Sequence, residues 1–339
     1  MANLPLPQHF AIDRVSHVWR VPYQELAKTA QQWAKEHNIT KANQDQPQAA
    51  LLLIDVQNTF CQPDFELFVG GRSGRGAIED NVRLCEFIYR QLGSLTQIIA
   101  TLDTHQTRQI FHPLFWVNPA GEHPAPMTII SPAAVQAGDW LPTQPELVAY
   151  ALYYVQQLES SGKYPLTIWP YHALLGGIGH ALVPAVEAAI FFHSIARQTQ
   201  PQIITKGDAP LTENYSAIAP EVTTDLRGQA IGRQNNELIE CLLKVDKLLI
   251  AGQAQSHCVA WTVADLLTAI QKIDPSLAHK VYLLSDCTSP VVVPGAVDYT
   301  DVANTAFDRF AAAGINIVKS TEIETRKMFP YNVVSAGTQ

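Results

Sequence analysis

The chain has 339 residues, of which 47% are hydrophobic and 16% charged, so it can bury a large core and is too poor in charge for a disordered chain. Its 23 lysines and arginines against 31 aspartates and glutamates give a formal charge of −8, which offers no basic surface to nucleic acid. The most apolar run, Ala181 to Phe192, contains Pro184 and Glu187 and does not suit a membrane span. We therefore expect a globular protein with neither a nucleic-acid nor a membrane partner.

The N-terminal sequence and the cysteine pattern indicate in which cellular compartment we expect the protein. Residues 1–14 lack a basic stretch followed by an apolar core, so we expect no secretory signal. The five cysteines form no CxxC pair and, being odd in number, cannot all pair with one another. This usage is typical of a reducing compartment, and we expect a cytoplasmic protein.

The N-terminal part predicts one helix ahead of the main fold. Pro22 suits a first helical turn, and apolar residues recur along one side from Tyr23 to Trp33. The polar stretch over residues 43–48 is typical of a linker. We therefore predict an N-terminal helical extension over residues 1–48.

The main fold is predicted to begin with a buried strand, because residues 49–55 open with a continuous apolar run. Similar runs recur further along, and stretches with helical periodicity lie between most of them. Strands alternating with helices indicate an α/β fold whose parallel sheet is covered on both faces and whose chemistry gathers at the carboxyl ends of the strands. The further predicted strands cover residues 97–102, 202–205, 247–251, 280–285 and 316–318, and the predicted helices cover residues 79–92, 146–158, 235–243, 259–270 and 302–313.

The interval of residues 106–164 interrupts this alternation. It is rich in proline at first and then holds the predicted helix over residues 146–158. We interpret it as a cap inserted over the active edge, within a domain of residues 49–339. A surface excursion with no role in binding is the alternative.

Polar residues follow several predicted strands, at the edge where a parallel sheet gathers its chemistry. Asp55 follows the first strand, and Lys206 and Cys258 follow two later ones. Cys258 lies in the predicted first turn of a helix, where the helix dipole and free backbone N–H groups favour a thiolate, and Ser256 is a candidate N-cap. Asp55 could take and return the thiol proton, while the charge of Lys206 would lower the thiol pKa.

A second polar group contains residue types that bind metals. Asp103 and His105 occupy alternating positions after the second strand, and His172 follows a Trp-Pro pair later in the chain. Two neighbouring groups and one distant histidine are a weak metal signature, and hydrogen-bonded structural histidines are the alternative.

Five short motifs contain these residues in chain order: DVQNTFC at 55–61, TLDTH at 101–105, WPYH at 169–172, KG at 206–207 with YSA at 215–217, and GQAQSHCV at 252–259. In this order they resemble the successive motifs of the isochorismatase-like cysteine hydrolases, and those of the nicotinamidase branch most. Five motifs in one order are far more specific than any one of them. The resemblance covers about residues 49–319, with the cap as an insertion.

The resemblance implies a doubly wound, mostly parallel central sheet of about six strands flanked by helices. It also implies that Cys258 is the nucleophile, Asp55 the general acid and base, and Lys206 the stabiliser of the thiolate. A cis peptide bond is implied between Gln253 and Ala254. The oxyanion would then lie against the N–H groups of Ala254 and Cys258.

A divalent metal is also implied, with Asp103, His105 and His172 as its ligands. Zinc is our first expectation, with iron or manganese as alternatives. Where nicotinamidases usually have a further histidine, this chain has Gln109. His112 or a water molecule could complete the shell.

The same resemblance places four residues around the ring of a nicotinamide-like substrate, although packing in the core is an equal alternative for the aromatic ones. These residues are Phe60, Trp169, Tyr215 and His257. The substrate stays open because the chain departs from the usual nicotinamidase residues at three further positions: Thr59, Ala173 and Ser256 stand where aspartate, cysteine and aspartate are usual.

We predict a cysteine hydrolase that cleaves a carbon–nitrogen amide bond of a small molecule through a thioester, most like a nicotinamidase that forms nicotinate and ammonia. Hydrolysis of a ureide, a carbamoyl compound or isochorismate is the alternative on the same fold. A catalytically silent binding or assembly protein is the alternative in another class. The N-terminal helix and the long insertion suit contacts between subunits, so we expect a homo-oligomer.

Overall fold

The computed structural model describes residues 4–323. Its central sheet has six strands, all parallel, in the order β12-β9-β8-β1-β2-β7. The predicted doubly wound parallel sheet is confirmed, and no strand boundary differs from its prediction by more than one residue. The strands are β1 (Ala49–Ile54), β2 (Gln97–Asp103), β7 (Gln202–Lys206), β8 (Lys247–Gly252), β9 (Val281–Leu284) and β12 (Asn316–Val318).

The central strand β1 faces two separate hydrophobic cores. Ala50, Leu52 and Ile54 point into one core, and Ala49, Leu51 and Leu53 point into the other. All six residues are buried. Because both faces of the strand are covered, its sequence is continuously apolar instead of alternating.

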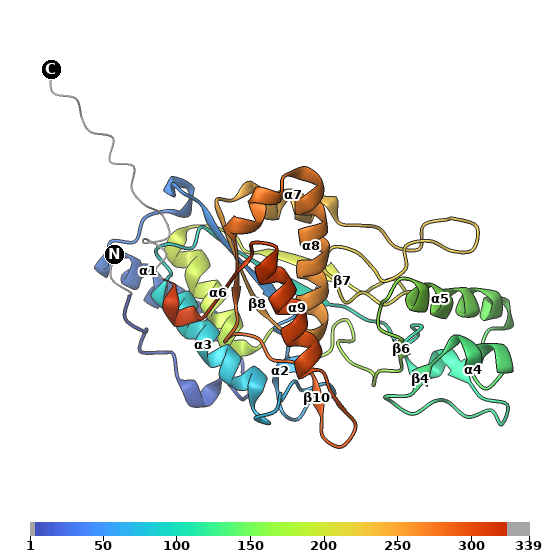
Figure 1. Cartoon of the computed structure of the whole chain (residues 1–339). Helices are drawn as coiled ribbons and strands as arrows, with labels where there is room; N and C mark the ends of the chain where they lie inside the picture. Colours follow the sequence, from blue (N-terminus) through green and yellow to red (C-terminus); the bar gives the residue numbers. More distant parts are fainter. Residues whose placement is uncertain (1–3, 324–339) are drawn as a thin grey trace.

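Helices cover both faces of this sheet (Figure 1). On one face α6 packs between α1 and α3, and α7, α8 and α9 lie on the other. The first group is α1 (Tyr23–Glu36), α3 (Gly76–Arg90) and α6 (Pro184–Arg197), and the second is α7 (Asn236–Lys244), α8 (Ala260–Ile273) and α9 (Thr300–Ala312). Helix α6 was not predicted. Ten of its 14 residues are buried, so it lacks the polar stripe that marks a surface helix.

Between β2 and β7 the chain leaves the sheet and forms a lobe beside it (Figure 1). The predicted helix over residues 146–158 is present as α5. The lobe contacts the loop after β7, because the Tyr150 hydroxyl donates to the Leu211 carbonyl. The lobe contains α4 (Pro132–Ala137), α5 (Val148–Ser160) and the short strands β3 (Trp116–Val117), β4 (Ile129–Ile130), β5 (Leu141–Pro142) and β6 (Leu166–Thr167).

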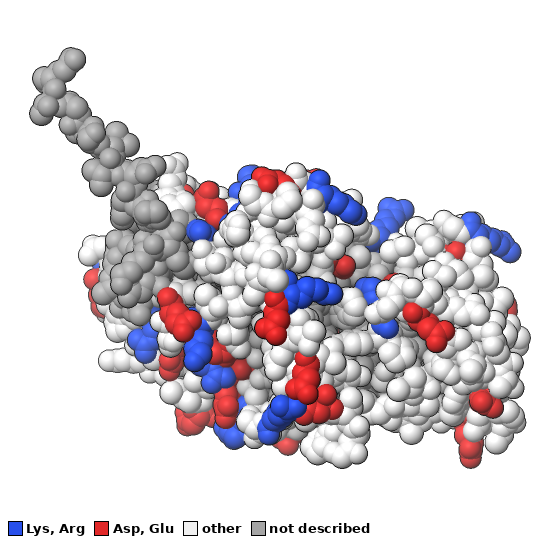
Figure 2. All heavy atoms as spheres, viewed as in Figure 1, with Lys and Arg blue, Asp and Glu red and all other residues white. Residues whose placement is uncertain are grey.

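Two short elements lie near the carboxyl edge of the sheet. One is α2 (Asn58–Cys61), directly after β1, and the other is the hairpin of β10 (Val292–Val293) and β11 (Val297–Asp298). None of the described helices is long and apolar enough to cross a membrane. On the face shown in Figure 2, lysines and arginines are interspersed with aspartates and glutamates.

Candidate active site

The structure brings the three residues of the predicted triad together. Asp55 follows β1 directly, Lys206 is the last residue of β7, and Cys258 lies in a π-helical turn, Gln255–Val259, between β8 and α8. Parallel strands deliver these residues to one edge of the sheet. The Lys206 ammonium lies 3.0 Å from Asp55 Oδ2 and 3.7 Å from Cys258 Sγ.

The Lys206 ammonium also contacts two further oxygens. It lies 2.8 Å from Asp103 Oδ1 and donates to the Asn214 carbonyl at 2.8 Å. The buried cation therefore links the triad to the predicted metal ligands through Asp103. Its neighbouring carboxylates raise the pKa of Lys206 well above the usual value, although burial opposes this, so Lys206 is charged.

Asp55 is held in an unusual backbone conformation. Its φ of 47° lies in the left-handed region, which residues other than glycine rarely adopt. The Thr101 hydroxyl accepts from the Asp55 N–H at 3.0 Å and donates to Asp55 Oδ1 at 2.5 Å. Such conformations persist where the surroundings fix them, and they cluster at functional sites.

The nucleophile turn differs locally from the prediction. Cys258 precedes α8 instead of lying in its first turn, and Ser256 is not an N-cap, because its hydroxyl contacts His257 Nδ1 at 2.8 Å and accepts from the Val291 N–H at 3.0 Å. The Gln253-Ala254 peptide bond is cis, as the resemblance implies.

Burial decides the protonation of the cysteine. It raises the pKa of the Cys258 thiol well above the usual range, and the nearby Lys206 lowers it only in part. Lys206 therefore acts in the predicted direction, but the resting thiol is protonated and the expected thiolate is not favoured. Burial also raises the pKa of Asp55, against the opposite effect of Lys206.

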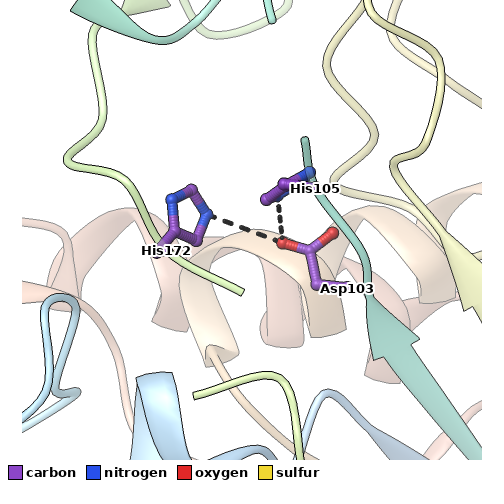
Figure 3. A group of neighbouring side chains, drawn as sticks. All are labelled: Asp103, His105 and His172. Carbon is purple, nitrogen blue, oxygen red and sulfur yellow. Dashed lines mark hydrogen bonds and ion pairs between the residues drawn. The ribbon is translucent and has the colours of Figure 1, made fainter. Parts of the chain in front are cut away.

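The predicted metal ligands form a second cluster beside the first. One ligand atom from each of Asp103, His105 and His172 lies within 4.8 Å of the others, and all three residues are buried (Figure 3). Asp103 Oδ2 is 2.7 Å from His105 Nε2 and 3.7 Å from His172 Nε2. Burial opposes ionisation of Asp103, but His105 and Lys206 hold its pKa well below the usual value.

Backbone carbonyls orient both imidazoles. His105 Nδ1 lies 3.0 Å from the Gly207 carbonyl, and His172 Nδ1 lies 2.8 Å from the Pro170 carbonyl. A carbonyl only accepts, so Nδ1 carries the hydrogen in each ring and Nε2 faces Asp103, as in metal-binding histidines. A Cβ at residue 207 would lie 2.7 Å from His105 and 2.8 Å from Asp103, so glycine is required there.

The two candidates for a fourth ligand differ in their contacts. The Gln109 amide donates to the Gly207 carbonyl and its oxygen accepts from the Gln106 N–H at 3.0 Å, so both ends of the amide already have partners. The His112 ring lies 5.9 Å from the rings of both His105 and His172. Its Nε2 is buried and has no hydrogen-bond partner among the described residues, so it is the better candidate.

A cavity of about 300 Å³ opens above these residues. The four predicted substrate-binding residues, Phe60, Trp169, Tyr215 and His257, all line it. Ala254, Cys258, Asp103 and His172 line it as well, whereas no residue of 106–164 does. The lobe contacts one lining residue, since the Tyr154 hydroxyl accepts from the Glu213 N–H at 3.0 Å. The cap boundaries remain a prediction.

Comparisons with known proteins bear on the fold of the chain. No protein-family model matches the chain. A nicotinamidase of Escherichia coli (strain K12) is 28% identical over 160 residues, which cover 45% of this chain and 58% of that relative. The yeast nicotinamidase Pnc1p, bound to the inhibitor nicotinaldehyde, superposes with a TM-score of 0.51 at 20% identity, over 80% of this chain and 99% of the yeast chain. An Acinetobacter baumanii nicotinamidase superposes with a TM-score of 0.50 at 20% identity, over 82% and 99% of the two chains.

The chain has the nicotinamidase fold. The resemblance drawn from the five motifs is confirmed at this level. The superpositions cover almost the whole of each known structure but about four fifths of this chain, so the chain adds residues to the nicotinamidase fold.

Within this nicotinamidase fold, the sequence analysis missed several residues that line the cavity. Glu213 is buried there, and burial raises its pKa to about 7. It stands two residues before the YSA motif, and a lone carboxylate in a loop gives no signal of its own. The remaining missed residues lie in the loop 65–69 and in the segment 291–294, which contains β10.

Proposed function

We propose that the protein is a cysteine hydrolase that cleaves the carbon–nitrogen bond of a small carboxamide, with nicotinamide as the first candidate substrate. One observation carries the proposal. Cys258, Lys206 and Asp55 meet at a cavity lined by aromatic side chains. The similarity to nicotinamidases in fold and in motif order supports it.

The resting protonation states suggest how the first step proceeds. The Cys258 thiol is protonated, so Asp55 accepts its proton as the sulfur attacks the carbonyl carbon. Asp55 then returns the proton to the departing ammonia, leaving a thioester on Cys258. Asp55 next takes a proton from a water molecule as its oxygen attacks the thioester carbon, and returns this proton to the departing sulfur, which restores the thiol. The acid product then loses its own proton to water and leaves as the carboxylate. Lys206 stays charged and stabilises the developing thiolate.

The nucleophile turn would hold the oxyanion. We assign this role to the N–H groups of Ala254 and Cys258, whose residues both line the cavity. Neighbouring donors are already used within the fold: the Gln255 N–H donates to the Ser289 carbonyl, and the His257 N–H to the Ala254 carbonyl.

The second cluster fits a divalent metal. Asp103, His105 and His172 would hold it, with the unpartnered Nε2 of His112 as a further donor. One carboxylate with two or three imidazoles is a donor set that zinc prefers and that iron and manganese also accept. A bound metal would supply positive charge that orients a substrate atom or a water molecule.

The charge of the cavity favours a neutral substrate over isochorismate. Glu66, Asp103 and Glu213 line it, and none of the described lining residues is lysine or arginine. An anionic substrate, such as isochorismate or a carbamoyl amino acid, would find positive charge only at the floor, from Lys206 and a bound metal, and would meet Glu66 elsewhere in the lining. Nicotinamide is uncharged and flat, and it suits an aromatic slot.

The test is ammonia release from nicotinamide and pyrazinamide by metal-loaded protein, with the Cys258→Ala protein as control. Turnover that requires Cys258, together with a thioester detected by mass spectrometry, is expected. Cleavage of a ureide, a carbamoyl compound or isochorismate in place of both amides would move the protein to that alternative. No turnover of any of these compounds would leave the silent binding protein as the remaining reading.

A further inference from the structure

The residues that line the cavity differ in polarity and burial between its floor and its opening. Cys258, Asp103 and His172 are buried at the floor. The outer lining contains Phe65, Glu66 and six further half-buried or exposed apolar residues. We name these six the apolar mouth: Leu67, Phe68, Val291, Val292, Val293 and Pro294. A ligand held at the floor by its amide would therefore direct its other end toward apolar side chains.

One wall of the apolar mouth is fixed to the nucleophile turn. The Val291 N–H donates to Ser256 Oγ at 3.0 Å, and the Tyr299 N–H donates to the Val291 carbonyl at 3.0 Å. Val292 and Val293 pair with β11, which Arg72 holds through Asp298 at 2.7 Å. The wall is thus held at both ends, which is typical of a pre-formed binding surface.

The opposite wall is fixed to the helix that carries Phe60. The Leu67 N–H donates to the Thr59 carbonyl at 3.2 Å, and the Val69 N–H donates to the Phe60 carbonyl at 2.8 Å. Both walls therefore hold apolar side chains in place without a ligand. Covering such side chains with an apolar group removes their surface from water, which favours binding.

The volume of the cavity also suggests a ligand larger than a single ring with an amide group. About 300 Å³ falls at the lower end of the range of about 300–1,000 Å³ seen for sites that take drug-sized ligands. A single ring with an amide group would fill the floor and leave the mouth uncovered.

We propose that the substrate is a carboxamide with an uncharged apolar substituent that lies against the apolar mouth. This inference rests on the proposed amidase function and names the substrate class within it. Glu66 lines the cavity and is exposed, so a substituent that ends in a carboxylate would be rejected.

The test compares nicotinamide with nicotinamides that carry methyl, ethyl or butyl at ring carbon 5 or carbon 6. For the ring position that faces the mouth, each methylene should raise kcat/KM about fourfold, because a buried methylene contributes about 0.8 kcal/mol. A carboxypropyl group, which is a similar length and anionic, should lose this gain. Dissociation constants for the Cys258→Ala protein, which binds without reacting, should follow the same order.

Substitutions in the mouth should change the preference between these substrates. Val292→Thr and Val293→Thr keep the side-chain shape and replace one methyl by a hydroxyl, which costs about 1 kcal/mol or more when it is covered without a partner. The ratio of kcat/KM for the butyl compound to that for nicotinamide should fall about fivefold or more. Val18→Thr, at a partly exposed position in the N-terminal extension, is the matched control and should keep the ratio.

The outcomes separate the inference from the proposed function. If nicotinamide is cleaved through Cys258 and no alkyl compound exceeds it in kcat/KM or in affinity, the inference is wrong and the amidase stands. If no amide is cleaved, the amidase proposal fails and the substrate class fails with it, and the dissociation constants then show only whether the mouth binds an apolar group. Tight binding of the carboxypropyl compound would also overturn it.

Discussion

Replacing Lys206 with methionine should destabilise the protein strongly at pH 8. The ammonium lies 3.0 Å from Asp55 Oδ2 and 2.8 Å from Asp103 Oδ1, and all three side chains are buried. At an effective dielectric constant of about 20, each contact contributes about 5 to 6 kcal/mol before desolvation is subtracted. Removing one partner of a buried ion pair costs about 3 to 5 kcal/mol net, because the other charge is left uncompensated. We expect a loss of that size in the free energy of unfolding.

The difference in the free energy of unfolding between wild type and Lys206→Met should decrease at acid pH. Burial raises the pKa of Asp55, and Lys206 is the main opposing influence, so without Lys206 this carboxyl takes up a proton at a higher pH. A neutral Asp55 needs no counter-ion, so the deficit relative to wild type decreases as the pH falls.

Urea denaturation of chelator-treated proteins at pH 8 and pH 5 measures this difference. Lys28→Met, at an exposed position of α1, is the matched control and should change the free energy of unfolding by less than about 0.5 kcal/mol. A loss below about 1 kcal/mol at pH 8, or an equal loss at both values, would refute the view of Lys206 as the counter-ion of two buried carboxylates.

Three further predictions concern the chemistry of the site. Cys258→Ala should abolish ammonia release without a large change in thermal stability. Asp55→Asn should be nearly as inactive, because an amide cannot accept the thiol proton. Near-normal activity of either variant would remove that residue from the mechanism. Protein purified without chelator should hold about one divalent ion per chain by elemental analysis. The metal occupancy should be lower in His172→Ala and at acid pH, where imidazole is protonated. Background metal levels in the wild-type protein would count against the site. In the folded protein burial raises the pKa of Glu213 from the ordinary 4.5 to about 7, so the folded protein binds an extra proton and stability should fall as the pH rises between these values. The fall should be up to about 3 kcal/mol in metal-free protein and absent in Glu213→Gln, and an equal fall in both would assign it to another group.

The sheet could be predicted because a strand that is buried on both faces has a continuous apolar sequence. Each central strand is a short apolar run, and the polar residue that follows it marks the carboxyl edge. Asp55 and Lys206 were found in this way, and the structure places them 3.0 Å apart. Helix α6 was not predicted from the sequence, because α1 covers the side that would otherwise face solvent. A helix buried on several sides lacks the periodic alternation of apolar and polar residues that marks an amphipathic helix.

The missed parts of the site depend on contacts between distant segments. Glu213 and one wall of the apolar mouth lie in loops, and the other wall lies in the short hairpin of β10 and β11. In such segments the side-chain type alone does not show which residues face a cavity. The state of the Cys258 thiol depends on how burial compares with the charge of Lys206, and the amount of burial is a property of the folded chain. The sequence indicates the groups that react, and the folded packing decides their resting protonation.

The strand order has a consequence for how the chain folds during synthesis. Strand β1 lies at the centre of the sheet between β2 and β8, and beside its start Gln48 bonds to Asp246, 198 residues further on. At a synthesis rate of about 5–20 residues per second, β1 waits roughly 10–40 s for that neighbour to be made. During this interval one edge of a fully apolar strand is unpaired, which is a site for pairing with other chains. We therefore expect the newly made protein to need a chaperone over this interval, and its yield to fall when slower synthesis lengthens the interval.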